Sequence, residues 1–145
     1  MNEVAGIIRK AIYTALNGNI SYNSVNIPIF DEAPDEAQSS HYILFSTQTE
    51  DDATNNARFV TEGEILLDIV TIHPSYTTKV VAESISDTIM GILTPTVTTR
   101  GITLPSGYSL TLFRRERSYS IPMLQSSTGK VIRKILRYSY RIQQN

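Results

Sequence analysis

The segment FVTEGEILLDIVTI, residues 59–72, alternates in the manner of a long β-strand. Its side chains divide between two faces. One face carries Ile65, Leu67, Ile69 and Thr71, and the other carries Glu64, Leu66, Asp68, Val70 and Ile72. We expect a β-bulge at Gly63, because an isolated glycine inside a strand often marks one.

Helical patterns lie on both sides of this strand. Apolar residues recur at three- and four-residue steps in residues 3–16 and 75–93. Further strands are expected at 25–30, 41–47, 108–119 and 130–142, with extended connections at 48–57, 94–107 and 119–129. The order α-β-β-β-α-β-β predicts an α+β fold, a mostly antiparallel sheet with two helices packed on one face. The last two strands predict a long C-terminal β-hairpin at about 108–142.

The composition limits the classes of protein to consider. With 145 residues, the chain is expected to form one domain, residues 1–145. It has no cysteine, which excludes disulfides, thiolate metal sites and a cysteine nucleophile. The opening helix is interrupted by Arg9 and Lys10, which is unlike a signal peptide or a membrane span. We therefore expect a protein of the cytosol with no membrane contact.

Charge is divided unevenly along the chain. Up to residue 68 there are eleven acidic and three basic residues, a net charge of −8, and from residue 69 there are ten basic and three acidic residues, a net charge of +7. This division suits either contact with a polyanion or the docking of copies of the chain on one another. It is equally consistent with a fold that interleaves the two halves and neutralises their charges across one surface.

Catalytic and metal-binding patterns are not found in the sequence. The two histidines, His41 and His73, each lie at a strand end, and neither has the spacing of a zinc-binding motif. The predictions are no catalytic residues, no metal, no cofactor and no enzymatic activity. A small-molecule enzyme that uses only Tyr, Ser and Arg is the remaining enzymatic alternative.

Two groups of charged residues are candidate contact surfaces. The first is a basic patch on the paired C-terminal strands, facing either a neighbouring subunit or a lumen: Arg114, Arg115, Arg117, Arg133, Arg137 and Arg141. The second is a set of acidic contact loops: Asp31, Glu32, Asp35, Glu36, Glu50, Asp51 and Asp52. The arginine fork matches both phosphates and carboxylates, and a solvated outer sheet face explains the same pattern. No aromatic residues interleave the arginines as in a platform for stacking bases.

The layout as a whole resembles a known family. IPIFDEAP at 27–34 and HYILF at 41–45 follow the opening helix, and EILLDIVTIH and VVAESISDTIMGIL come next. Over roughly residues 5–93 these segments resemble the small tail-completion and tail-terminator, or head–tail joining, proteins of tailed bacteriophages. His41 stands where the family pattern has proline, and the hairpin at 108–142 is less typical of it.

The resemblance implies a structural virion protein that assembles into a ring, usually of six copies. Such a ring lies at the end of the tail tube or in the neck, contacts other neck, connector or tail-tube proteins, and surrounds the DNA passage. It implies localisation in the virion, and in the host cytoplasm during assembly. Two unlike faces must complement each other in a ring, which the charge division could supply. The alternative is a nucleic-acid-binding module that uses the basic C-terminal sheet face.

Overall fold

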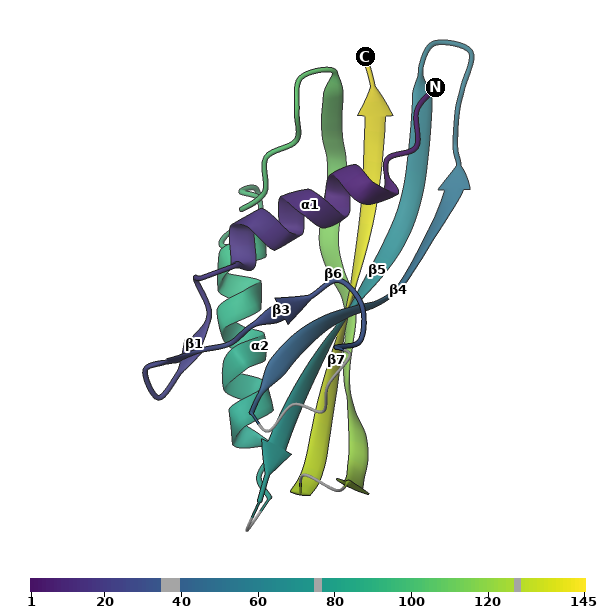
Figure 1. The fold of residues 1–145 in the computed structure, drawn as a ribbon. Coiled ribbons are helices and arrows are strands. Elements are labelled where there is room, and N and C mark those ends of the chain that lie inside the picture. The colour runs from purple at the N-terminus through teal and green to yellow at the C-terminus, as the bar shows by residue number, and fades with distance from the viewer. Residues whose placement is uncertain (35–39, 75–76, 127–128) are drawn as a thin grey trace.

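A computed structural model describes residues 1–34, 40–74, 77–126 and 129–145 (Figure 1). The elements in chain order are α1 (Ala5–Leu16), β1 (Ser21–Tyr22), β2 (Val25–Asn26), β3 (Ile29–Phe30), β4 (Tyr42–Asp52), β5 (Phe59–His73), α2 (Val80–Leu93), β6 (Tyr108–Ser126) and β7 (Gly129–Gln144). The two ends of the chain lie close together, and Asn2 N–H donates a hydrogen bond to Gln144 Oε1 at 2.9 Å.

The large sheet has five strands in the order β3-β4-β5-β7-β6. β3 runs parallel to β4, and the other three pairings are antiparallel. With the helices, these strands give the order α-β-β-β-α-β-β and confirm the predicted α+β class. β1 and β2 form a separate two-stranded hairpin that the sequence analysis did not anticipate. Its turn residues Asn23 and Ser24 both have positive φ, as tight hairpin turns require.

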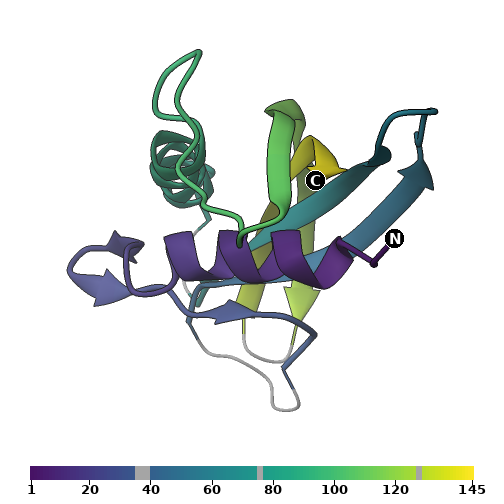
Figure 2. The same ribbon diagram turned by 90° about the horizontal axis from the view of Figure 1, so that it is seen from above.

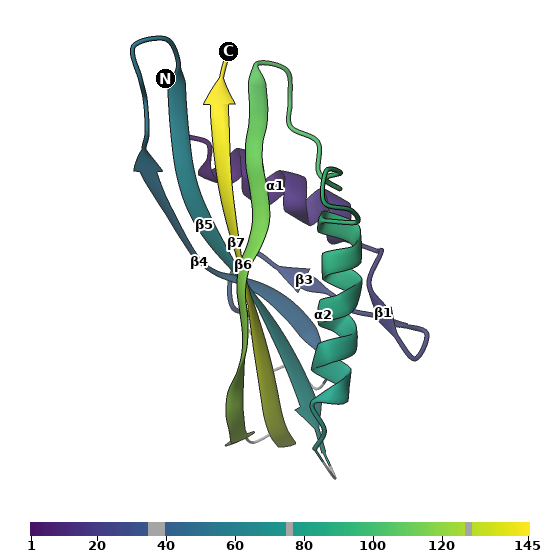
Figure 3. The same cartoon turned by 180° about the vertical axis from the view of Figure 1, so that it is seen from behind.

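Both helices cover the same face of the large sheet (Figures 2 and 3). α2 runs along the strands, whereas α1 lies across them (Figure 1). α1 buries Ile8 and Ile12, and α2 buries Ile85 and Ile89, which is the four-residue spacing seen in the sequence. α2 begins at Val80, later than predicted, and residues 75 and 76 of the predicted helix lie outside the described residues. The Thr78 hydroxyl accepts the Val80 N–H at 3.2 Å, while the N-cap residue Lys79 makes no side-chain capping hydrogen bond. Neither helix of the described residues is long and apolar enough to cross a membrane.

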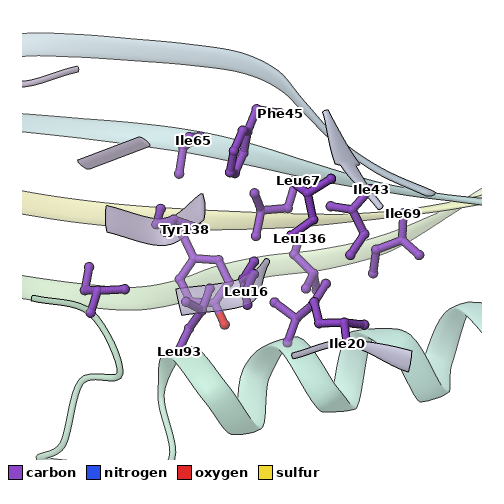
Figure 4. Packing of buried hydrophobic residues seen from close by; sticks show 14 of the residues in the cluster. Leu16, Ile20, Ile43, Phe45, Ile65, Leu67, Ile69, Leu93, Leu136 and Tyr138 are labelled. Carbon is purple, nitrogen blue, oxygen red and sulfur yellow. The ribbon is translucent and has the colours of Figure 1, made fainter. Parts of the chain in front are cut away.

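The hydrophobic core lies between the helices and this covered face (Figure 4). Its central members from the sheet are Ile43, Phe45, Ile65, Leu67, Ile69, Leu136 and Tyr138. Leu16 and Leu93 pack on them from the helix ends, and the rings of Phe113 and Tyr138 stack with centroids 5.0 Å apart. Each large apolar side chain buried in this way contributes roughly 1.5–3 kcal/mol to folding.

Cross-strand pairing corrects two expectations about β4 and β5. The predicted loop at 48–57 is wrong in its first half, because residues 49–52 continue β4 and pair with residues 61–64 of β5. The predicted bulge at Gly63 is also wrong, because the register shift lies in β4 between Phe45 and Gln48. Polar residues here form a regular strand because they lie at the edge of the sheet, where solvent hydrates their side chains.

The strands at either end of the sheet also differ from expectation. Residues 119–126, predicted as part of an extended connection, continue β6, since Tyr119 pairs with Ile135 and Leu124 with Val131. Residues 127 and 128 of that connection lie outside the described residues. The predicted strand at 25–30 divides at Ile27–Pro28 into β2 and β3. Proline cannot donate a ladder hydrogen bond, and it sits where the chain passes from one sheet to the other.

Gly63 has a packing role. A Cβ at this position would lie 2.5 Å from Tyr140 Cζ and 2.7 Å from the Thr49 carbonyl oxygen. The missing side chain therefore lets the Tyr140 ring lie across β5 and reach β4. Glycine is required here by close approach.

Candidate functional site: the charged open face of the sheet

The face of the large sheet opposite the helices is called here the open face. Successive side chains of a strand point to opposite faces. Tyr138 and Tyr140 of β7 point into the core, so the odd-numbered residues of β7 point to the open face. Five of the six arginines proposed from the sequence lie on it: Arg114, Arg117, Arg133, Arg137 and Arg141. Arg115 pairs with Tyr138 and points to the helix-covered face, where its guanidinium donates to Ser118 Oγ at 3.3 Å. The structure brings five of the six together.

Three ion pairs connect β7 to β5 across the open face. They are Arg133–Asp68, Arg137–Glu64 and Arg141–Glu62. The exposure of the acidic side chain rises along this ladder, from 2% for Asp68 to 52% for Glu62. The ladder therefore runs from a buried ion pair to a solvent-screened one, and removal of one partner costs most at the buried end.

Arg133 and Asp68 form the buried end of the ladder. Arg133 Nε donates to Asp68 Oδ1 and Oδ2 at 3.2 and 3.1 Å, and its Nη2 also donates to Oδ2. The hydrogen bond to Asp68 raises the pKa of Arg133 above its usual range. The pair links β5 and β7 on this face, within the register that the two strands share.

Among the described residues, the open face carries equal numbers of positive and negative charges. Its five arginines face five carboxylates on the same surface: Asp51, Glu62, Glu64, Asp68 and Glu116. Arg114 Nε lies 2.9 Å from Glu116 Oε2, which adds a fourth ion pair, on the neighbouring strand β6. The acidic first half of the chain thus neutralises much of the basic second half within one sheet, the interleaving that the sequence left open.

A shallow depression on the open face lies around Arg117. Its volume is about 300 Å³. It is lined by residues of the four strands β4, β5, β7 and β6: Thr47, Thr49, Glu64, Leu66, Arg137, Arg117 and Tyr119. Arg117 is exposed and makes no ion pair within the described part of the chain. Tyr119 beside it is 41% exposed. Arginine and tyrosine are both enriched at protein–protein interfaces.

The residues proposed as acidic contact loops separate in the structure. Asp31 pairs with Arg9 at 2.8 Å, and Glu32 is exposed beside it. Asp35 and Glu36 lie outside the described residues. The other three acids are the last three residues of the strand β4, Glu50, Asp51 and Asp52. They therefore lie on a strand and not in a loop.

A polar network under α1 was missed by the sequence analysis. Tyr140 O–H donates to Glu50 Oε1 at 2.7 Å and accepts from Gln48 Nε2 at 2.8 Å. Gln48 Oε1 in turn accepts from Arg9 at 3.0 Å. Burial raises the pKa of Glu50 and that of Tyr140. The sequence signal for this network is Gly63, because a glycine inside a strand leaves room for the aromatic ring of a neighbouring strand.

His41 and His73, which the sequence placed at separate strand ends, lie side by side with ring centroids 5.6 Å apart. His41 Nδ1 accepts the Ile72 N–H at 3.0 Å, and His73 Nε2 lies 3.0 Å from Thr71 Oγ1. Burial lowers the pKa of both rings. Among the described residues, no three acidic or histidine side chains are grouped as metal ligands would be.

Comparison with known proteins gives a result at the level of the fold. No family model and no curated protein sequence matches this chain. Among solved structures, it matches a chain in the virion of a native gene transfer agent particle, with a TM-score of 0.71 and 15% sequence identity. The match covers 99% of this chain and 99% of that chain. The protein therefore has, over its whole length, the fold of a chain of a gene transfer agent virion.

Proposed function

We propose that this protein is a structural subunit of a tailed bacteriophage or phage-like particle. The observation that carries the proposal is the fold match along the whole of both chains, which includes the C-terminal hairpin β6–β7. It agrees with the resemblance of residues 5–93 to tail-completion and tail-terminator proteins. An ion-paired sheet face with a shallow depression also suits a role in assembly.

The finer proposal is a tail-completion, tail-terminator or neck ring subunit that joins the tail to the head connector. In this role about six copies would surround the DNA passage, and they would contact neck, connector or tail-tube proteins. The subunit would be non-enzymatic, present in the virion, and free in the host cytoplasm during assembly. Support comes from the family resemblance of residues 5–93.

The charge balance of the open face favours this role over that of a nucleic-acid-binding module. Three of its arginines are held by carboxylates of β5 and a fourth by Glu116. Binding to phosphates depends on cations that are free to replace counterions. A passage lined by this surface would let DNA slide without holding it.

Electron microscopy of particles made without this chain tests the proposal. We expect heads and tails that do not join, or tails of abnormal length, and restoration by the wild-type chain supplied in trans. Antibody labelling of complete particles should mark the neck or the tail end. Particles that assemble and transfer DNA normally in the absence of the chain would refute the structural role.

A further inference from the structure

The large sheet ends in two open edges (Figure 3). β6 forms one edge over its whole length of 19 residues. β3 pairs only with Ile43 and Leu44 of β4, so residues 45–52 of β4 form the other edge. Within the described residues, no strand pairs with either of them. The N–H and C=O groups along such edges are templates for an added strand.

The two edges carry opposite charges. The β6 edge has three exposed arginines, Arg114, Arg115 and Arg117, and one acid, Glu116, which lies 2.9 Å from Arg114. The β4 edge has three consecutive acids, Glu50, Asp51 and Asp52. Pairing β6 with β6 of another copy would place arginines opposite arginines, which is unfavourable. Pairing β6 with β4 can place Arg114 and Arg115 opposite carboxylates. Charge complementarity therefore selects the heterologous contact, the type that generates rings.

The directions of the two edge strands fit the same contact. Three antiparallel pairings separate β4 from β6, so these strands run in opposite directions. A copy rotated about a ring axis would present its β4 antiparallel to β6 of its neighbour. The alternation of strands would then continue from copy to copy, and every added hydrogen bond would be of the antiparallel kind.

We propose that copies of this chain join edge to edge, β6 of one copy pairing with residues 45–52 of β4 of the next, to form one continuous antiparallel sheet. This inference rests on the proposed ring and names its interface. Residues 45–52 of β4 pair with no further strand in the described part of the chain, and β6 greatly exceeds the usual strand length of roughly 3–10 residues.

One register satisfies the charges on both faces. If Asp51 lies opposite Arg114 of the next copy, Glu50 lies opposite Arg115. Asp51 and Arg114 both point to the open face, while Glu50 and Arg115 both point to the helix-covered face. Within one copy, Arg114 is level with Thr49 through the paired strands. The register therefore needs a stagger of two residues between copies, and closure of a sheet into a barrel requires such a stagger.

Charge reversal tests the proposal. R114E/R115E gives a copy with two acidic edges, and E50K/D51K gives a copy with two basic edges. We expect each variant alone to lose at least tenfold in assembly by native mass spectrometry, and an equimolar mixture to regain it in alternating order. Because Glu50 also binds Tyr140, the pair R114E and D51K repeats the test without disturbing that contact. K10E/K79E, which changes exposed charges on the helices, is the matched control.

Cross-linking gives an independent test, since the chain contains no cysteine. In an antiparallel pair, opposite Cβ atoms lie about 4.5–5.5 Å apart. Oxidation of the purified D51C/R114C oligomer, and of particles carrying it, should give a ladder of linked copies, which K10C/R114C should not. Rings that assemble unchanged in the reversal variants and do not cross-link would overturn the edge contact and leave the virion role intact. A chain dispensable for particle assembly would overturn that role as well.

Discussion

Asp68 has only 2% of its side chain exposed, and Arg133 is the cation that neutralises it. Removal of Arg133 would leave a buried carboxylate without its charged partner, which is far more costly than loss of a surface pair. We predict that Arg133→Met lowers the free energy of unfolding by about 2–3 kcal/mol. Urea denaturation followed by circular dichroism measures it.

The matched control is Arg141→Met, at the exposed end of the same ladder, where 44% of the arginine side chain is accessible. Loss of a solvent-exposed pair costs less than about 1 kcal/mol. Equal losses in the two variants would show that burial of Asp68 does not govern the ladder.

Substitution by alanine should lower the stability of the protein at Gly63 and raise it at Gly91. A methyl group at Gly63 would meet the Tyr140 ring and the Thr49 carbonyl, so Gly63→Ala should destabilise by about 1–3 kcal/mol. Gly91 lies in α2 with nothing within 4 Å of an added Cβ, so Gly91→Ala should stabilise by up to about 1 kcal/mol. Thermal melts of the two variants check this, and a neutral Gly63→Ala would refute the close-packing role of glycine.

At the scale of elements, the paired histidines at one end of β4 and β5 should make stability depend on pH. Burial lowers the pKa of both rings in the folded state below 6.5. As pH falls below about 6.5, the unfolded chain binds protons that the folded protein does not, so the free energy of unfolding decreases. Above that pH both states hold neutral rings and this dependence disappears.

The double variant His41→Asn/His73→Gln keeps an acceptor for the Ile72 N–H and a partner for Thr71 without a titrating ring. We predict that the wild-type protein loses stability between pH 7 and pH 5.5 and that the variant loses clearly less, measured as urea midpoints across this range. Parallel curves for the two proteins would show that the pair does not carry the dependence.

The sequence predicted the elements with strong periodicity and failed where pairing overrides local pattern. Residues 59–72 and the α1 and α2 patterns were recognised because one face of each is apolar. The acids Glu50, Asp51 and Asp52 suggested a loop, since nothing local shows that they pair with β5. The Tyr140 network joins residues 90 or more positions apart, which is beyond any local signal.

In the folded molecule, the charges that are divided along the sequence lie next to one another. The halves of the sequence carry −8 and +7, yet β5 and β7 bring much of this charge into neighbouring rungs of one sheet. Composition along the chain could not reveal this, because neutralisation depends on which strands are adjacent. Charges of opposite sign remain on the two edge strands, arginines on β6 and acids on β4.

The paired arginines should make the protein a poor binder of DNA. We predict a dissociation constant for a short duplex weaker than about 100 µM at physiological salt, with little dependence on salt concentration. Glu62→Gln/Glu64→Gln frees Arg141 and Arg137 and should bind more tightly with a steeper salt dependence. Fluorescence anisotropy across a salt series checks both proteins, and steep salt-dependent binding by the wild type would support the nucleic-acid-binding alternative.

Native mass spectrometry of the purified chain over a range of concentrations, alone and with tail tubes, tests whether the chain forms a ring. We predict one closed assembly with an integral number of 16.2 kDa copies, near 97 kDa for six, and few open intermediates. A species that stays at 16.2 kDa at every concentration and in the presence of tubes would refute ring formation.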